Sequence, residues 1–382
     1  MPAASILIKP ASANCNIDCK YCFYKCLSSN REEYSKGFMK EDTLEQLVKN
    51  AIDYADGYLA FAFQGGEPTL AGIDFFRNVV ELQEKYNDKN LTIENTIQTN
   101  GIKINEEWAR FLSEHHFLVG VSLDGPKKLH DANRVDVNGK PTFYQVMNTI
   151  SLFEQFHVQY NILTVVTNET AQKASALYHF YKRNQMAYIQ LIPCMDEINR
   201  KDEVNRNSQA VKPEQYGTFL NEMFDLWYED FMHGEDMDIR MFSNLAQLSA
   251  GFPAEECGMN GNCNCYFVVE GDGSVYPCDF YCMDEWKLGT VNEPFQTMLV
   301  SERAKAFLSR GSELHEKCSS CPHFSLCRGG CRRWRETGEE GKFDLNYLCP
   351  AYEIFFTHCS ERIHELGKMI QQKYGTYQES RQ

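Results

Sequence analysis

The stretch CNIDCKYCFY, residues 15–24, places three cysteines in one short loop, at Cys15, Cys19 and Cys22. It follows the first apolar, β-rich run of the chain, SILIK at residues 5–9. A structural zinc site normally has four protein ligands, so three thiols form either an incomplete zinc site or a site that is left open. Three thiolates can bind three irons of a 4Fe-4S cluster and leave the fourth iron open to a substrate. At this point the loop fits either an open iron-sulfur site or a zinc knuckle that borrows a distant ligand.

The composition is that of a soluble globular protein with metal or redox chemistry. The 382 residues are long enough for one large domain and a smaller one, and the net charge of -15 disfavours a nucleic-acid partner. No apolar run approaches the roughly 18 to 20 residues of a membrane span, and the first residues lack the features of a secretory signal. We therefore expect a cytoplasmic protein without a membrane partner. In a reducing compartment, the sixteen cysteines indicate metal or redox sites rather than disulfides.

Short apolar runs alternate with helix-period segments through the first two thirds of the chain. The runs are SILIK (5–9), LAFAF (59–63), TIENTIQ (92–98), FLVGVSL (117–123), YNILTVV (160–166) and YIQLI (188–192). This alternation predicts an α/β fold with a parallel sheet, closed in part as a (β/α)6 TIM-like barrel. Functional side chains should then lie at the carboxyl ends of the strands.

The helix-period segments and the later turns define the predicted domains. Apolar residues repeat at helical spacing over 213–233, and Asp42 with Glu45 resembles a capping box at the start of an earlier helix. After Gly234 the alternation stops, cysteines become dense, and the run EGDGSVYPCDFY predicts a hairpin. We predict a barrel over residues 1–234, a cysteine-rich domain over 235–350, and a C-terminal helix with a frayed tail over 351–382.

A second motif, FQGGEPTL at residues 63–70, follows the second predicted strand. Glycines at Gly65 and Gly66 would let the backbone approach a ligand closely. Together with the three-cysteine loop, this motif resembles the signature of the radical S-adenosylmethionine enzymes. The resemblance implies that the open iron binds S-adenosylmethionine and that electron transfer to it yields a 5′-deoxyadenosyl radical. The residues that it places against the cofactor are Tyr21, Gly65, Gly66, Glu67, Ser122 and Arg134.

The second half of the chain contains a further set of cysteines, including CSSCPHFSLCRGGC at residues 318–331. Their spacing resembles the SPASM extension of radical enzymes that modify peptides, which implies two auxiliary iron-sulfur clusters and three 4Fe-4S clusters in all. The resemblance assigns Cys257, Cys263, Cys278 and Cys331 to the first auxiliary cluster, and Cys318, Cys321, Cys327 and Cys349 to the second. Four thiolates saturate each auxiliary cluster, so neither should bind substrate. Two zinc ribbons also fit the later spacing.

Five cysteines remain outside these sets: Cys26, Cys194, Cys265, Cys282 and Cys359. Buried free cysteines often behave as small hydrophobic residues, so we expect most of them to be inert. Cys265 lies two positions after Cys263, and the two could exchange roles as ligands.

The resemblance extends over nearly the whole chain and is strongest to the anaerobic sulfatase-maturating enzymes. It is carried by LIKPAS, CKYCFY, FAFQGGEPTLAG, FLVGVSLDGP, FDLWYEDF, CGMNGNCNCYFVVEGDGSVYPCDFY and CRGGCRRWR. That family oxidises a cysteine or serine of a sulfatase polypeptide to Cα-formylglycine, within a short motif that has Pro and Arg downstream. The resemblance implies that Asp279 is the catalytic base, that Tyr24 and Gln64 line the substrate pocket, and that an external donor such as flavodoxin or ferredoxin supplies electrons.

Two other functions fit parts of this pattern. A radical enzyme that forms a thioether or carbon-carbon crosslink in a peptide would share the cluster ligands without needing Asp279. A zinc-stabilised protein that binds a partner without catalysis would share the cysteine-rich half.

Overall fold

The computed structural model describes residues 3–195, 209–336 and 344–375. The chain forms two compact units, each assembled from segments that are distant in sequence. The first consists of residues 1–123, 130–161 and 264–309, and the second of residues 124–129, 162–263 and 310–382.

The first unit is built on a mixed sheet whose strands follow the order β10-β9-β8-β1-β2-β3-β4. The strands are β1 (Ala4–Ile8), β2 (Tyr58–Phe63), β3 (Thr92–Thr99), β4 (Leu118–Ser122), β8 (Val268–Val269), β9 (Ser274–Tyr276) and β10 (Gly289–Thr290). Strands β1 to β4 are parallel, and β8 joins β1 in the same direction. The antiparallel strands β9 and β10 complete the edge. The carboxyl ends of β1 to β4 therefore lie along one edge, where the predicted site residues follow them.

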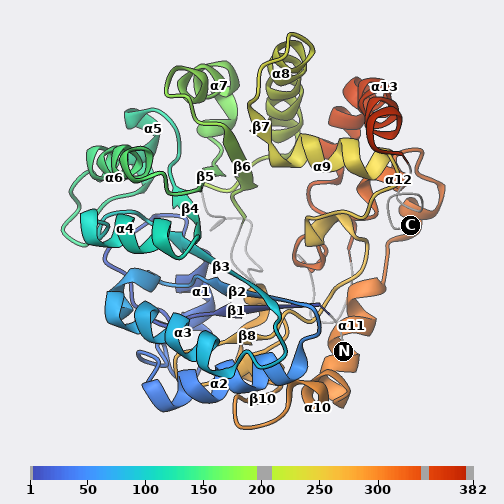
Figure 1. Cartoon of the computed structure of the whole chain (residues 1–382). Coiled ribbons are helices and arrows are strands. Elements are labelled where there is room, and N and C mark those ends of the chain that lie inside the picture. Colours follow the sequence, from blue (N-terminus) through green and yellow to red (C-terminus); the bar gives the residue numbers. More distant parts are fainter. Residues whose placement is uncertain (1–2, 196–208, 337–343, 376–382) are drawn as a thin grey trace. The chain divides into compact units, whose positions relative to one another are not determined.

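Helices of the first unit alternate with its strands. They are α1 (Phe23–Ser29), α2 (Glu41–Tyr54), α3 (Ile73–Tyr86), α4 (Glu106–Glu114), α6 (Phe143–Phe156) and α10 (Phe295–Leu299), with the 3-10 turns η1 (Pro68–Ala71), η5 (Asp279–Tyr281) and η6 (Asp284–Trp286). Helices α2 and α3 pack against each other (Figure 1). The apolar stripe of α2 is buried as its periodicity predicts. The predicted capping box is wrong, because the helix begins at Glu41 and Asp42 already lies in its first turn.

The second unit contains three parallel strands and a group of long helices. The strands are β5 (Tyr160–Val166), β6 (Tyr188–Pro193) and β7 (Asp238–Ile239), in that order. The helices are α7 (Ala174–Arg183), α8 (Pro213–Met232), α9 (Arg240–Ser249), α12 (Phe324–Cys327) and α13 (Cys349–Tyr374), with the 3-10 turns η2 (Thr170–Gln172), η4 (Cys257–Met259), η7 (Glu316–Ser320) and η8 (Arg332–Trp334). Two further helices, α5 (Lys127–Asn133) and α11 (Glu302–Ser312), contain the boundaries of the units.

Helix α13 packs along α8 and α9 (Figure 1). The contact with α8 is close at Gly217, where an added Cβ would lie 2.9 Å from the carbonyl oxygen of Ala351. A glycine at this position is therefore what lets the two helix backbones approach each other.

The structure confirms the six predicted strands, the helix over 213–233 and the hairpin between β8 and β9. The domain limits at residues 234 and 350 stay a prediction, and residues 376–382 of the predicted tail lie outside the described residues. In the described part of the chain, no helix combines the length and apolar character that crossing a membrane requires.

Candidate functional site

The three-cysteine loop lies between β1 and α1, and backbone contacts fix its path. The amide of Asp18 donates to the carbonyl of Val135 at 2.7 Å, and the amide of Lys20 donates to the carbonyl of Asn133 at 3.1 Å. The last cysteine, Cys22, is the residue that precedes α1. All three thiols are therefore held on one short, anchored segment at the carboxyl end of a strand.

Polar side chains from elsewhere in the first unit contact these thiols. The Asn100 amide lies 3.8 Å from the Cys15 sulfur, and the Arg134 guanidinium lies 3.8 Å from the Cys19 sulfur. Arg134 also lies over the Tyr21 ring, 5.4 Å from its centroid. Burial raises the pKa of Cys15 to about 11, and the neighbouring Cys22 thiol adds to that rise. One buried and two partly buried thiols that come together without forming a disulfide suit an iron-sulfur cluster, whose iron stabilises the thiolates.

The glycine turn after β2 packs directly on this loop. Gly65 and Gly66 have φ values of +85° and +52°, and an added Cβ on Gly66 would lie 2.2 Å from the carbonyl oxygen of Asn14. The amide of Glu67 donates to that same carbonyl at 2.8 Å. Only glycine fits this close approach, so the motif brings its backbone beside the cysteine loop.

The carboxylate of Glu67 is buried and accepts four hydrogen bonds. Its donors are the amide and hydroxyl of Thr69 at 3.0 and 2.6 Å, the hydroxyl of Thr99 at 2.8 Å and the amide of Asn100 at 2.7 Å. Burial raises the pKa of Glu67, and these donors oppose that rise. Three of these bonds reach Oε1 and one reaches Oε2, and together they tie the end of β2 to the end of β3 through Glu67.

Asp279 lies at the centre of a second cluster in the first unit. Its Oδ2 accepts a hydrogen bond from the Tyr24 hydroxyl at 2.6 Å and another from the Gln64 amide at 2.9 Å. The Gln64 amide is also 3.1 Å from the Tyr24 hydroxyl. The Oδ1 oxygen forms an ion pair with the Lys9 ammonium at 2.8 Å. Two donors thus hold Oδ2, and the Lys9 ammonium faces Oδ1.

Lys9 connects Asp279 to a buried ion-pair network. Its ammonium lies 3.5 Å from a carboxylate oxygen of Glu270, 3.4 Å from the Cys282 sulfur and 4.6 Å from the centroid of the Tyr24 ring. Glu270 also pairs with Arg31 at 2.8 Å. Two buried cations thus face two carboxylates, which fixes Asp279 in a low-dielectric environment.

The charges of this network stabilise one another. Burial opposes the charge on Lys9, but the carboxylates of Asp279 and Glu270 more than offset it, and the pKa of Lys9 is raised. Burial would raise the pKa of Glu270, yet Lys9 and Arg31 lower it. Burial and Asp279 raise the pKa of Tyr24 well above its usual range. Tyr24 therefore stays a neutral hydrogen-bond donor to Asp279.

Seven cysteines of the second unit form two groups. Cys257, Cys263 and Cys331 are close enough that the first two raise the pKa of Cys331, to which burial makes the largest contribution. The second group consists of Cys318, Cys321, Cys327 and Cys349. Burial raises the pKa of Cys327 to about 11, and the other three thiols of its group add to the rise.

Two predicted site residues, Cys278 and Ser122, lie at the ends of other elements. Cys278 belongs to the first unit and directly precedes η5, and Ser122 is buried at the end of β4. Among the described residues, no three His, Cys, Asp or Glu side chains are placed to hold a single metal ion. In a 4Fe-4S site each thiolate binds a different iron, so the thiols of such a site need not meet at one point.

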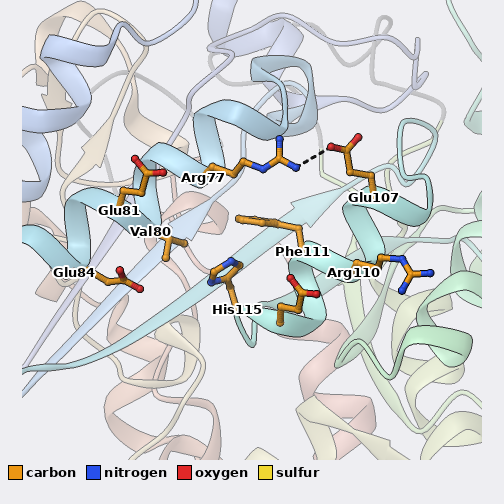
Figure 2. A pocket seen from close by; sticks show the side chains of 9 residues that line it. Arg77, Val80, Glu81, Glu84, Glu107, Arg110, Phe111 and His115 are labelled. Atoms are coloured by element: carbon orange, nitrogen blue, oxygen red, sulfur yellow. Dashed lines mark hydrogen bonds and ion pairs between the residues drawn. The ribbon is translucent and has the colours of Figure 1, made fainter.

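A pocket of about 450 Å³ between α3 and α4 lies apart from the predicted site residues, none of which lines it (Figure 2). Its walls are Arg77, Val80, Glu81, Glu84, Glu107, Arg110, Phe111, Glu114 and His115. The Arg77 guanidinium pairs with Glu107 at 2.8 Å, and both side chains are exposed. The charged side chains of this pocket are solvated, whereas those around Asp279 form a buried ion-pair network.

Sequence reasoning missed Lys9, Arg31 and Glu270. A signal for Lys9 was present, because a lysine ends the apolar run SILIK, where a charged side chain needs a partner once it is buried. The partners of Lys9 are about 260 to 270 positions away in the sequence and have no local pattern that announces them.

Two regions of the chain match known family models. Residues 10–181 match the model of the radical SAM superfamily, and residues 257–322 match the model of an iron-sulfur cluster-binding domain, SPASM. The chain therefore has the α/β radical SAM fold followed by a SPASM domain, and it is a radical SAM oxidoreductase.

Individual relatives match over almost the full length. The chain is 45% identical over 371 residues to the cysteine-type anaerobic sulfatase-maturating enzyme of Clostridium perfringens, covering 97% of this chain and 100% of that protein. It is 33% identical to the serine-type enzyme of Bacteroides thetaiotaomicron, covering 92% and 88%. A solved structure of native anSMEcpe with bound AdoMet and a Cp18Cys peptide aligns with a TM-score of 0.91 and 44% identity, covering 97% and 100%. The chain thus belongs to the family of the anaerobic sulfatase-maturating enzymes.

Proposed function

We propose that this protein oxidises a cysteine in a sulfatase polypeptide to Cα-formylglycine. The observation that carries the proposal is the cluster of Tyr24, Gln64 and Lys9 around Asp279 in the same unit as the three-cysteine loop. A relative of cysteine type at 45% identity and a solved relative that contains a Cys peptide support cysteine as the target.

The proposed cofactors are S-adenosylmethionine and three 4Fe-4S clusters. Cys15, Cys19 and Cys22 would hold the cluster that binds S-adenosylmethionine, and the two later cysteine sets would hold the auxiliary clusters. When bound and reduced, the first cluster and S-adenosylmethionine supply a 5′-deoxyadenosyl radical, which can take a hydrogen atom from the target. Gly65, Gly66 and Glu67, with Tyr21, Ser122 and Arg134, would line the cofactor.

Asp279 would act on the thiol of the target cysteine. Removal of one hydrogen atom from Cβ, one proton from the thiol and one electron leaves a thioaldehyde, and hydrolysis of the thioaldehyde gives the aldehyde and hydrogen sulfide. Asp279 would receive the proton on Oδ1, which faces one donor, Lys9, whereas Oδ2 faces two, Tyr24 and Gln64. An auxiliary cluster would receive the electron. A carboxylate held in one orientation is a more effective base than one free to rotate.

The partners of this reaction are a peptide and an electron donor. We propose an unfolded sulfatase segment of the Cys-x-Pro-x-Arg type as the substrate, and a flavodoxin or ferredoxin as the donor that reduces the first cluster. A cytoplasmic location suits both partners and agrees with a sequence that contains sixteen cysteines.

The direct test is anaerobic incubation of the reconstituted protein with S-adenosylmethionine, a reductant and a Cys-x-Pro-x-Arg peptide. We expect the peptide to lose about 18 Da, whereas a crosslinking enzyme would remove about 2 Da. The protein should contain about twelve irons, the content of three 4Fe-4S clusters. An unchanged peptide in the presence of rapid S-adenosylmethionine cleavage would contradict the proposed substrate.

A further inference from the structure

Three buried arginines follow Cys331 in the run CRRWR of the second unit. Arg332, Arg333 and Arg335 are 1%, 7% and 2% exposed. Arg332 forms a salt bridge with Glu336 at 2.8 Å. Arginine stays charged in proteins, so each of these side chains needs nearby compensation for the loss of water.

Arg335 lacks the usual compensation for a buried cation. Its guanidinium donates to the carbonyl of Gly311 at 2.7 Å and to the carbonyl of Glu313. Its Nε atom is buried and has no hydrogen-bond partner within the described residues, and no ion pair joins Arg335 to a described carboxylate. A fully charged group in this position is strongly unfavourable unless an anion lies close to it.

Cysteines of the first auxiliary group are candidates for that anion. Gly311, whose carbonyl Arg335 holds, packs directly on Cys263, and an added Cβ on Gly311 would lie 2.6 Å from the Cys263 sulfur. Through Gly311, Arg335 therefore lies beside the segment that carries Cys263, where a thiolate would compensate its charge.

We propose that Arg335 is the counter-charge of the iron-sulfur cluster that Cys257, Cys263 and Cys331 help to bind, and that it raises the reduction potential of this cluster. The inference rests on the cluster assignment made under the proposed function. Addition of one electron makes a thiolate-bound cluster more negative, so a fixed cation stabilises the reduced state more than the oxidised state. Burial strengthens the effect because little water screens it.

The second cysteine group provides a comparison within the same unit. The cation near it is Lys317, which favours the thiolate of Cys349 but is exposed and pairs with Glu353 at 3.0 Å. Solvent and the paired carboxylate both weaken its influence. The first auxiliary cluster should therefore have the higher potential of the two and be the one that receives the electron from the substrate.

The test is potentiometric titration followed by electron paramagnetic resonance. The parent is the full chain with Cys15→Ala, Cys19→Ala and Cys22→Ala, so that only the auxiliary clusters respond, and it should contain about eight irons. We expect Arg335→Met to lower the reduction potential of the first auxiliary cluster by at least about 59 mV, which is a tenfold change in the equilibrium constant for a one-electron reduction. The potential of the second auxiliary cluster should stay unchanged. Arg335→Lys, which keeps the charge, should shift it less, and the control Lys317→Met should shift neither by that amount.

The other possible outcomes each support or overturn the role of Arg335. If the parent and Arg335→Met had equal reduction potentials, the role of Arg335 would be overturned. It would also be overturned if Arg335→Met and Arg335→Lys changed the reduction potential, or the iron content, by equal amounts. Loss of four irons in Arg335→Met but not in Arg335→Lys would support the counter-charge. A parent with about four irons or none would instead overturn the proposed auxiliary clusters, and this inference with them, before any arginine is changed.

Discussion

The two cysteine-rich regions differ in how many thiols they bring to one place. The loop after β1 contributes three, all from residues 15–22, and its other neighbours are Asn100 and Arg134. The group that includes Cys327 contributes four, which come from η7, the residue after it, α12 and the first residue of α13. Four thiolates complete the protein ligation of a 4Fe-4S cluster, and three leave one iron for another molecule. Under the proposed function, the difference of one thiol separates a site for chemistry from a site for electron transfer.

The largest expected effect comes from removing one thiol from each region. Cys15→Ala should abolish S-adenosylmethionine cleavage, because the cofactor loses the cluster that binds and reduces it. Cys327→Ala should retain cleavage and lose formylglycine formation, because the second auxiliary cluster is damaged while the first loop is intact. Chromatographic measurement of 5′-deoxyadenosine, with mass spectrometry of the peptide, separates the two. If Cys15→Ala still produced 5′-deoxyadenosine, the difference between the regions would disappear.

A smaller effect is expected at the base. Asp279→Asn keeps the shape of the side chain but cannot accept the proton, so formylglycine should fall by about 10²- to 10⁴-fold, the usual contribution of general base catalysis. Iron content and S-adenosylmethionine cleavage should be close to those of the unchanged protein. The measurement is the ratio of formylglycine to 5′-deoxyadenosine. A ratio equal to that of the unchanged protein would reject Asp279 as the base.

Replacing Lys9 should reduce formylglycine formation less than replacing Asp279, because Lys9 orients Asp279 without reacting. Lys9→Met leaves Glu270 and Asp279 facing each other without this cation, so we expect a loss of about tenfold in formylglycine per S-adenosylmethionine cleaved, and some loss of stability. Lys9→Arg keeps the charge and should restore part of the product. If thermal unfolding changed equally in both variants and the product ratio changed in neither, Lys9 would be only a structural residue.

The smallest effect is expected at the exposed pair of the α3–α4 pocket. Glu107→Gln breaks the contact with Arg77, which is also bound by Asp74, and should change the free energy of unfolding by less than about 1 kcal/mol. Product formation should be unchanged. Urea unfolding and the peptide assay check both points, and a loss of activity here would show that the pocket takes part in the reaction.

The strand pattern and the cysteine spacing were predictable from the sequence because both are local. The alternation of apolar runs predicted six strands, and the C-x3-C-x2-C spacing placed three thiols on one loop, as the structure shows. The network around Asp279 could not be derived in this way. Its members Lys9, Arg31 and Glu270 come from segments far apart in sequence, and only the folded sheet brings β1 beside β8.

The same limit applies to details that depend on competing contacts. The expected capping box at Asp42 failed because the helix begins one residue earlier, with Glu41 and Asp42 both in its first turn. The motif around Glu67 was recognised, but the four donors that surround its carboxylate were not, since two of them belong to the end of β3 and the following residue.

The most direct test of the central claim is whether the cluster on the three-cysteine loop has an open iron. Electron paramagnetic resonance spectra of the reduced, full-length protein should be recorded with and without S-adenosylmethionine, alongside the Cys15→Ala, Cys19→Ala, Cys22→Ala variant. The account predicts that S-adenosylmethionine changes the spectrum of the unchanged protein and leaves that of the variant as it was. A spectrum that S-adenosylmethionine does not alter in either protein, at a full content of iron, would contradict it.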